Sequence, residues 1–209
     1  MRVILIHGLG RTPLSLIGLA RELRRAGHRT ELVAYFAAVE SYQRILRRVR
    51  RRIHRAAERG EPYAIVGHSL GGLLARVALD PWPTVRPLPR HLVLLGTPNT
   101  VPRLAQRFHR SLLYRLVNGE SGQLLARPSF FAELPAPTVP TTVIAGTRSW
   151  MGPLRLLGET ANDGIVAVAE TRLGPGAPVV ELPASHTFMM NNPQVRAAVR
   201  SILAGPSCN

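Results

Sequence analysis

Short apolar runs alternate with longer amphipathic stretches along nearly the whole chain. The runs are rich in Val, Ile and Leu and are bounded by Gly or Pro, which is typical of buried strands. They predict strands at residues 2–6, 30–35, 63–66, 91–95, 141–145 and 179–182. The amphipathic stretches predict helices at residues 13–26, 40–59, 70–79, 102–117 and 193–203. This alternation predicts an α/β fold, with a mostly parallel sheet of roughly six strands and helices on both faces.

The length of 209 residues fits a single α/β domain. One connection breaks the rhythm: residues 98–140 separate two predicted strands, whereas most connections in compact domains have about 4–6 residues. We interpret this segment as an insertion at the carboxyl edge of the sheet, where α/β proteins bind ligands, and as a candidate small lid over such a site. The alternative is an ordinary crossover helix followed by a long surface tail.

The sequence Gly67-His68-Ser69-Leu70-Gly71 stands between a predicted strand and a predicted helix. In this context a Gly-x-Ser-x-Gly turn holds the Ser hydroxyl above the sheet, where it can act as a nucleophile. The glycines let the backbone make the turn, and the start of the helix directs backbone N–H groups at the site. The alternative is a Gly-rich turn in which the Ser is structural.

A second Gly-rich turn, His7-Gly8-Leu9-Gly10, directly follows the first predicted strand. An acyl-transfer enzyme needs N–H donors for the oxyanion that forms on the attacked carbonyl group. One donor is expected from the residue after the nucleophile, Leu70, and the other from a loop after an earlier strand. The backbone amides of Leu9 and Leu70 are therefore the expected oxyanion hole, although the turn taken alone fits a structural role equally well.

A nucleophilic Ser also needs a general base. The chain has seven His, at positions 7, 28, 54, 68, 91, 109 and 186. Two of them belong to the Gly-rich turns, and most of the others fall in predicted helices or beside predicted strands. His186 stands in a loop after the last predicted strand. This position makes His186 the expected base.

The chain has only two Asp, so there are few candidates for the carboxylate that orients the base. Asp80 follows the helix that begins after Ser69, so it falls at the opposite edge of the sheet. Asp163 lies in an Asn-Asp-Gly turn after a predicted strand. Asp163 is therefore the expected acid, with Glu159 and Glu170 as alternatives.

Five segments together resemble small bacterial lipases and esterases of the α/β-hydrolase superfamily, and in particular the branch with the lactonising and minimal lipases. They are Val-Ile-Leu-Ile-His-Gly-Leu-Gly at 3–10, Ile-Val-Gly-His-Ser-Leu-Gly-Gly at 65–72, Leu-Leu-Gly-Thr-Pro-Asn at 94–99, Asn-Asp-Gly-Ile-Val at 162–166 and Ser-His-Thr-Phe at 185–188. The order Ser, Asp, His along the chain is also that of α/β hydrolases. The resemblance extends from residue 3 to about residue 203.

The resemblance implies a serine hydrolase that cleaves carboxylic esters without a metal or organic cofactor. It implies Ser69 as nucleophile, His186 as base, Asp163 as the orienting acid, and the amides of Leu9 and Leu70 as the oxyanion hole. It also implies a minimal sheet that begins at the first His-Gly strand and lacks the two leading antiparallel strands of larger hydrolases.

The substrate is less constrained by the sequence. Apolar residues near the predicted site could line an acyl-binding pocket or belong to the core. The candidate substrate-binding residues are Leu14, Thr97, Phe130 and Phe131. The alternative functions are thioester hydrolysis or acyl transfer on the same residues, and a non-catalytic scaffold of this fold that binds anionic lipid or nucleic acid.

All 27 basic residues are Arg, against 12 acidic residues, which gives a formal net charge of +15. Eight Arg lie in the predicted helix from Arg44 to Arg59. This segment is either a solvated helix face or a surface for peripheral contact with an anionic membrane. Nucleic acid is disfavoured because aromatic residues make up 5% of the chain and none interleaves these Arg.

The ends of the chain carry little further information. No signal peptide is recognisable before the first predicted strand, and no apolar run approaches the roughly 18 residues of a membrane span. We therefore expect a cytoplasmic protein that is peripheral to membranes at most. The lone Cys, Cys208, excludes an internal disulfide framework.

Overall fold

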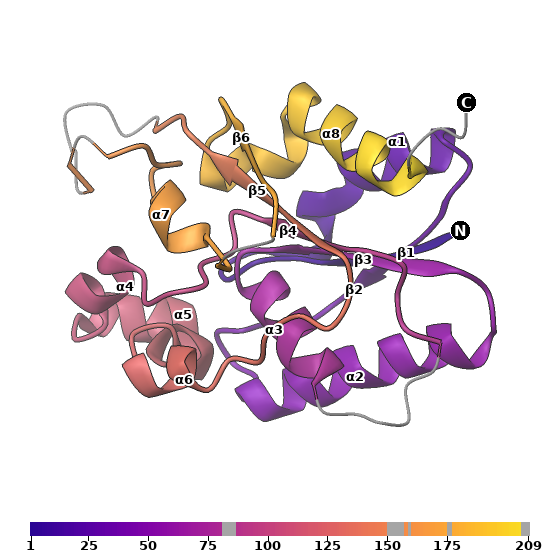
Figure 1. Cartoon of the computed structure of the whole chain (residues 1–209). Helices are drawn as coiled ribbons and strands as arrows, with labels where there is room; N and C mark the ends of the chain where they lie inside the picture. The colour runs from indigo at the N-terminus through magenta and orange to yellow at the C-terminus, as the bar shows by residue number, and fades with distance from the viewer. Residues whose placement is uncertain (81–86, 150–156, 159, 175–176, 206–209) are drawn as a thin grey trace.

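In the computed structural model, the described residues form one sheet of six strands in the order β2-β1-β3-β4-β5-β6, and every neighbouring pair is parallel (Figure 1). The strands are β1 (Arg2–Ile6), β2 (Arg29–Val33), β3 (Tyr63–His68), β4 (Leu92–Leu95), β5 (Thr141–Gly146) and β6 (Val179–Leu182). The structure describes residues 1–80, 87–149, 157–158, 160–174 and 177–205. Glu159 and Cys208 lie outside these residues. The predicted parallel α/β sheet is confirmed.

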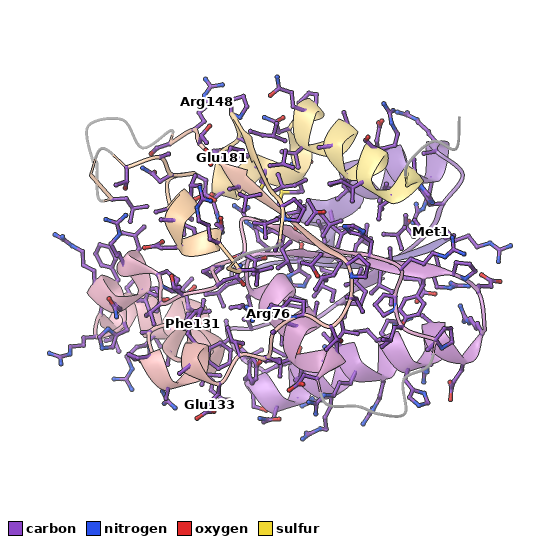
Figure 2. All side chains as sticks on the ribbon, viewed as in Figure 1. Met1, Arg76, Phe131, Glu133, Arg148 and Glu181 are labelled. Atoms are coloured by element: carbon purple, nitrogen blue, oxygen red, sulfur yellow. The ribbon has the colours of Figure 1, made fainter. Side chains whose placement is uncertain are left out.

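Helices cover both faces of this sheet (Figure 1). The described helices are η1 (Pro13–Leu16), α1 (Ile17–Arg25), α2 (Tyr42–Glu58), α3 (Leu70–Leu79), α4 (Arg103–Phe108), α5 (Leu112–Leu124), α6 (Pro128–Ala132), α7 (Val168–Thr171), η2 (His186–Asn191) and α8 (Pro193–Ala204). The layer of α1 and α8 lies on one face, and the layer of α2 and α3 lies on the other. Side chains fill the space between the sheet and each layer (Figure 2).

Along each strand, side chains point alternately toward the two helix layers. Ile4 and Ile6 of β1 pack with α2 and α3, whereas Val3 and Leu5 of the same strand pack with α1 and α8. All four side chains are fully buried. A strand that is buried on both faces must be apolar throughout, and the central strands β1, β3, β4 and β5 accordingly appear in the sequence as nearly continuous apolar runs. The edge strands β2 and β6 are partly exposed and carry polar residues.

The short helices α6, α7 and η2 were not predicted, and two of the predicted helices are divided in the structure. The stretch 13–26 begins as a 3₁₀ turn before it becomes α1, and the stretch 102–117 is two helices, α4 and α5, separated at 109–111. The apolar spacing continues across both breaks, so periodicity does not reveal them. The last helix begins as expected, with the Asn192 side chain accepting hydrogen bonds from the amides of Gln194 (2.8 Å) and Val195 (3.3 Å).

The segment 98–140 forms α4, α5 and α6, which lie beyond the carboxyl ends of the strands (Figure 1). Arg76 of α3 holds this segment against the core. Its guanidinium donates to the Pro135 carbonyl (2.6 Å) and to Asn99 Oδ1 (2.6 Å), and burial lowers its pKa to about 10. The closing of this segment as a lid stays a prediction.

Candidate active site

Ser69 stands at the junction of β3 and α3 in a backbone conformation that only glycine adopts easily. Its φ of 51° is the one positive φ of a non-glycine residue among those described, and such a conformation costs of order 1–3 kcal/mol. Neighbouring glycines leave no space for a side chain. A Cβ added to Gly71 would lie 2.3 Å from the Ile6 carbonyl oxygen, and one added to Gly67 would lie 2.5 Å from Gly72 Cα. The turn is therefore fixed by close backbone packing.

His186 and Asp163 form a buried pair at the same edge of the sheet. His186 Nδ1 lies 2.7 Å from Asp163 Oδ2, and the His186 amide donates to the Asp163 carbonyl (2.9 Å). Asp163 Oδ1 accepts from the amides of Ile165 (3.0 Å) and Val166 (2.7 Å). Because an ionised carboxylate can only accept, Nδ1 carries the proton of a neutral His186 and Nε2 is left as an acceptor.

Two glycines make room for this pair. A Cβ added to Gly96, after β4, would lie 3.1 Å from both Asp163 Oδ2 and His186 Nδ1. A Cβ added to Gly146, the last residue of β5, would lie 2.7 Å from Asp163 Cβ and 2.3 Å from the Ala184 carbonyl oxygen. The resemblance had placed the loop from Gly96 to Pro98 at the border of the pocket, whereas sequence reasoning did not single out Gly146. The available signal was a glycine directly after an apolar strand.

The loop after β1 lies directly against the Ser69 turn. A Cβ added to Gly8 would meet Ser69 Cβ at 3.0 Å and His68 Nδ1 at 2.7 Å. Leu9 follows in this loop and lines the same cavity as Ser69. Leu70 is the first residue of α3, and the amides of a first helical turn have no acceptor within the helix. The two expected oxyanion donors therefore belong to adjoining segments.

His7 and Tyr35 pack against each other where the loop after β1 begins, and both contact this loop. The His7 ring stacks on the Tyr35 ring, with 3.9 Å between the ring centres, and His7 Nδ1 lies 2.9 Å from the Gly8 carbonyl oxygen. The Tyr35 hydroxyl donates to the His7 carbonyl. Burial lowers the pKa of His7 and raises that of Tyr35. Both side chains are fully buried, so their role is to shape the loop.

His68 connects the Ser69 turn with the His186 loop. Its Nε2 lies 3.0 Å from the His186 carbonyl oxygen, and the two rings are 4.8 Å apart. Since a carbonyl only accepts, Nε2 is the protonated nitrogen, and Nδ1 is buried without a partner among the described residues. Burial places the pKa of His68 well below its usual range. The prediction had assigned this residue to the turn alone.

The other carboxylates that were considered as the acid lie apart from His186. Glu170 binds Arg103 (3.1 Å) and accepts from the Ala167 amide (2.9 Å). Asp80 follows α3 at the end opposite to Ser69. Among the described carboxylates, the structure therefore brings only Asp163 to His186.

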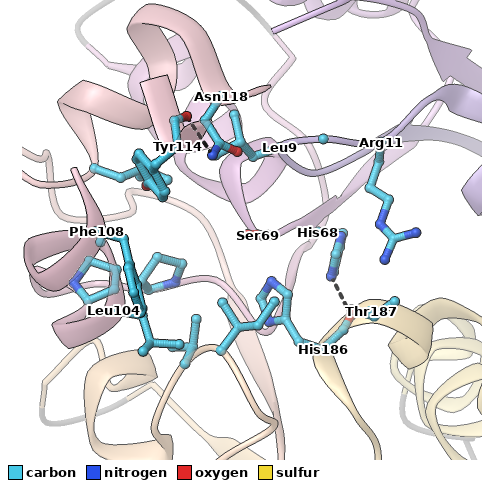
Figure 3. Close-up of a pocket in the computed structure, with 17 residues that line it drawn as sticks. Leu9, Arg11, His68, Ser69, Leu104, Phe108, Tyr114, Asn118, His186 and Thr187 are labelled. Atoms are coloured by element: carbon cyan, nitrogen blue, oxygen red, sulfur yellow. Dashed lines mark hydrogen bonds between the residues drawn. The ribbon is translucent and has the colours of Figure 1, made fainter. Parts of the chain in front are cut away.

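A cavity of about 510 Å³ opens beside Ser69 (Figure 3). Its lining combines residues of the Ser69 turn, the loop after β1, the His186 loop and the segment 98–140. The lining residues are Leu9, Gly10, Arg11, His68, Ser69, Pro98, Pro102, Leu104, Ala105, Phe108, Tyr114, Asn118, Leu125, Ile165, Val166, His186 and Thr187. The wall formed by α4 and α5 is mostly apolar.

None of the four candidate substrate-binding residues is in the described lining of this cavity. Leu14 is 70% exposed on η1, and Thr97 is fully buried with its hydroxyl 3.5 Å from the Gly67 carbonyl oxygen. Phe130 and Phe131 pack edge-to-face on each other, and Phe130 also packs on Tyr42 of α2. The apolar wall comes instead from residues such as Leu104 and Phe108, whose helical spacing the sequence already contained.

Most arginines of α2 are tied to the protein itself. Arg48 forms two hydrogen bonds to Glu40 (3.0 and 2.6 Å), Arg44 also contacts Glu40, and Arg52 contacts Glu31, as does Arg59 directly after the helix. In the described part of the chain, fewer arginines of this helix are therefore available to bind an anionic membrane than the sequence suggested. That contact stays a prediction.

The sequence matches the family described as alpha/beta hydrolase over residues 3–199, and the chain belongs to this family. It is a hydrolase with a six-stranded, minimal form of the fold. No curated protein matches the sequence. Within the described residues, no helix has the length and apolar character needed to cross a membrane.

Several solved structures share the fold. The mature form of a lipase from Bacillus licheniformis has a TM-score of 0.80 at 15% identity, with 97% of this chain and 91% of that chain covered. A phospholipase from Legionella pneumophila has a TM-score of 0.65 at 20% identity, with 83% and 46% covered. Tomato methylketone synthase I has a TM-score of 0.61 at 15% identity, with 97% of each chain covered.

Proposed function

We propose that the protein is a serine hydrolase that cleaves carboxylic esters through Ser69, His186 and Asp163. The observation that carries this proposal is the buried His186–Asp163 pair (2.7 Å), which opens on the same cavity as a Ser held at positive φ. Strain of this kind persists where the surrounding structure enforces it, and it is concentrated at functional sites.

The reaction follows from the roles that these groups can take. His186 Nε2 accepts the proton of Ser69 as its oxygen attacks the ester carbonyl, and Asp163 stabilises the imidazolium that forms. The amides of Leu9 and Leu70 hold the oxyanion, a contribution for which one lost donor typically costs about 100–1,000-fold in rate. His186 then protonates the leaving alcohol, and water hydrolyses the acyl-enzyme.

The surroundings favour a carboxylic ester with an apolar acyl part. Leu104, Ala105 and Phe108 line one side of the cavity, and no step needs a metal or an organic cofactor. The similar structures include a lipase and a phospholipase, which accords with a fatty acyl substrate. Hydrolysis of a thioester or acyl transfer would use the same groups.

The test is hydrolysis of p-nitrophenyl esters from acetate to palmitate by the wild type and the Ser69→Ala variant. We expect kcat to fall by about a million-fold in the variant, with the fold retained, because the nucleophile is lost. Labelling of the wild type at Ser69 by a serine-directed phosphonate gives an independent readout. Inactivity of the folded wild type on every ester, together with no labelling, would sink the proposal and favour a binding scaffold.

A further inference from the structure

The described lining of the cavity contains one arginine, Arg11, and no Asp or Glu. Arg11 follows the Gly8–Gly10 turn after β1, so it belongs to the loop that lies against Ser69. Figure 3 shows Arg11 on the side of His68 and Thr187, away from Leu104 and Phe108. The cavity therefore has a cationic end and an apolar end, with Ser69 between them.

The charge of Arg11 is not neutralised within the described protein. No described residue forms an ion pair or a hydrogen bond with its guanidinium. Asp163, the carboxylate of the candidate site, is 1% exposed and already bound to His186 and two amides. The positive charge of Arg11 also acts on His68, which lines the same cavity. It contributes to the lowered pKa of His68 after the larger effects of burial and of His186.

A guanidinium at such a place has a specific chemical preference. It is charged at every physiological pH, and its planar fork binds phosphate or carboxylate through two parallel hydrogen bonds. Many arginines of this basic chain are bound elsewhere, for example by Glu40, Glu31 and Glu170. Arg11 differs because it faces the cavity of Ser69 with no acidic partner.

The apolar end of the cavity fixes the direction in which an ester would lie. An acyl chain gains by burial against the wall of α4 and α5, at about 25 cal/mol for each Å² of apolar surface. The alcohol part of the ester then extends past Ser69 and His186 toward Arg11 and Thr187.

We propose that Arg11 is a specificity-determining residue that binds an anionic group, a phosphate or a carboxylate, on the alcohol part of the ester. This inference rests on the proposed ester hydrolysis and adds the class of substrate. The preferred substrates are anionic esters such as acylated glycerol phosphates or acylated hydroxy acids, and neutral esters are poorer substrates of the same site.

The test compares esters that share an acyl chain and differ in the charge of the alcohol. One pair is monooctanoylglycerol and its phosphate monoester, and the other is propyl octanoate and octanoyloxypropanoate. We expect the wild type to prefer the anionic member of at least one pair by about tenfold or more in kcat/KM, mainly through KM. The pair that shows the larger ratio identifies phosphate or carboxylate as the bound group.

The variants are Arg11→Gln, Arg11→Lys and, as a matched control, Arg110→Gln. Arg110 is exposed between α4 and α5, outside the described lining, and its loss changes the net charge equally. We expect Arg11→Gln to abolish the anionic preference, Arg11→Lys to keep part of it as a point charge, and Arg110→Gln to keep it in full.

Two results overturn the inference. One is equal hydrolysis of both members of each pair by a wild type that is active and labelled at Ser69. The other is an equal loss of preference in Arg11→Gln and Arg110→Gln, which would assign the effect to the overall field. Failure of the proposed hydrolysis itself looks different, because then neither neutral nor anionic esters react and Ser69 is not labelled.

Discussion

Two parts of the cavity differ in how tightly their residues are held: the floor, formed by the Ser69 turn and the His186–Asp163 pair, and the wall, formed by α4 and α5. On the floor, Ser69, His68, Asp163 and His186 are buried, and the last three are held by hydrogen bonds to backbone groups or to each other. The glycines around them leave no space for a methyl group. The wall comes from short helices, and α5 exposes large apolar side chains to solvent, with Leu113 71% exposed.

This difference separates chemistry from selectivity. In the proposed mechanism, a shift of about 1 Å on the floor would disturb the geometry of proton transfer, whereas the wall would only have to offer apolar surface of a suitable shape. Changes on the floor are therefore expected to alter the rate on every substrate. Changes in the wall are expected to alter which substrates are preferred.

Among the changes that test the difference between floor and wall, Asp163→Asn on the floor is expected to have the largest effect on kcat. An Asn side chain can still accept from the amides of Ile165 and Val166, so the fold is retained. The imidazole of His186 then loses its carboxylate and adopts the wrong tautomer, which lowers kcat by about 10,000-fold. The measurement is kcat on a p-nitrophenyl ester, together with thermal unfolding.

The matched control for this change is Asp80→Asn, at the one other Asp of the chain, which should keep wild-type kcat. A loss smaller than about tenfold in Asp163→Asn would mean that another group orients His186, and the distinction between floor and wall would lose its main support.

In the wall, Phe108→Ala is expected to change selectivity by a smaller factor. Phe108 lines the cavity and is 37% exposed. Its loss should lower kcat/KM for decanoate esters by about tenfold, because one lost apolar contact is worth roughly 1–3 kcal/mol. Acetate esters, which do not reach the wall, should be hydrolysed as before.

The control for Phe108→Ala is Leu113→Ala, which removes an exposed apolar side chain of α5 that is outside the described lining of the cavity. The measurement is kcat/KM for p-nitrophenyl esters from acetate to decanoate, with the wild type, Phe108→Ala and Leu113→Ala. Equal losses of Phe108→Ala on acetate and decanoate would contradict the proposed role of the wall.

The same contrast explains how much the sequence could predict. The strands were predicted within two or three residues. In the central strands this is because burial on both faces leaves nearly continuous apolar runs, and in the edge strands β2 and β6 because β-branched residues remain beside the polar ones. Ser69 was selected by its Gly-x-Ser-x-Gly motif, His186 by its place in a loop after the last predicted strand, and Asp163 because the chain has only two Asp. The structure brings His186 and Asp163 into contact and places Ser69 in the same cavity.

What the sequence did not reveal depends on contacts between distant segments. Gly96 and Gly146 matter because of the space they leave for Asp163 and His186, and no local pattern shows that space. The acyl wall was assigned to Phe130 and Phe131, since apolar residues of an insertion serve equally well as core. In the structure they pack on α2 and on each other.

The smallest expected effect tests whether His68 stays neutral on the floor. Burial lowers its pKa in the folded protein, whereas an unfolded His titrates near 6.5. As the pH falls below about 6.5, the unfolded chain therefore binds a proton that folded His68 does not. The free energy of unfolding should then decrease, by up to about 1.4 kcal/mol per pH unit for this one group.

Urea unfolding between pH 5 and pH 8 measures this slope. His68→Gln should reduce it, because Gln can still donate to the His186 carbonyl but does not titrate. Some slope should remain from His7, whose pKa is also lowered by burial. Thr97→Ser, a buried neutral change on the same floor, should lower stability equally at every pH. If His68→Gln keeps the full wild-type slope, His68 is not the group that titrates, and the floor tolerates charge better than its packing implies.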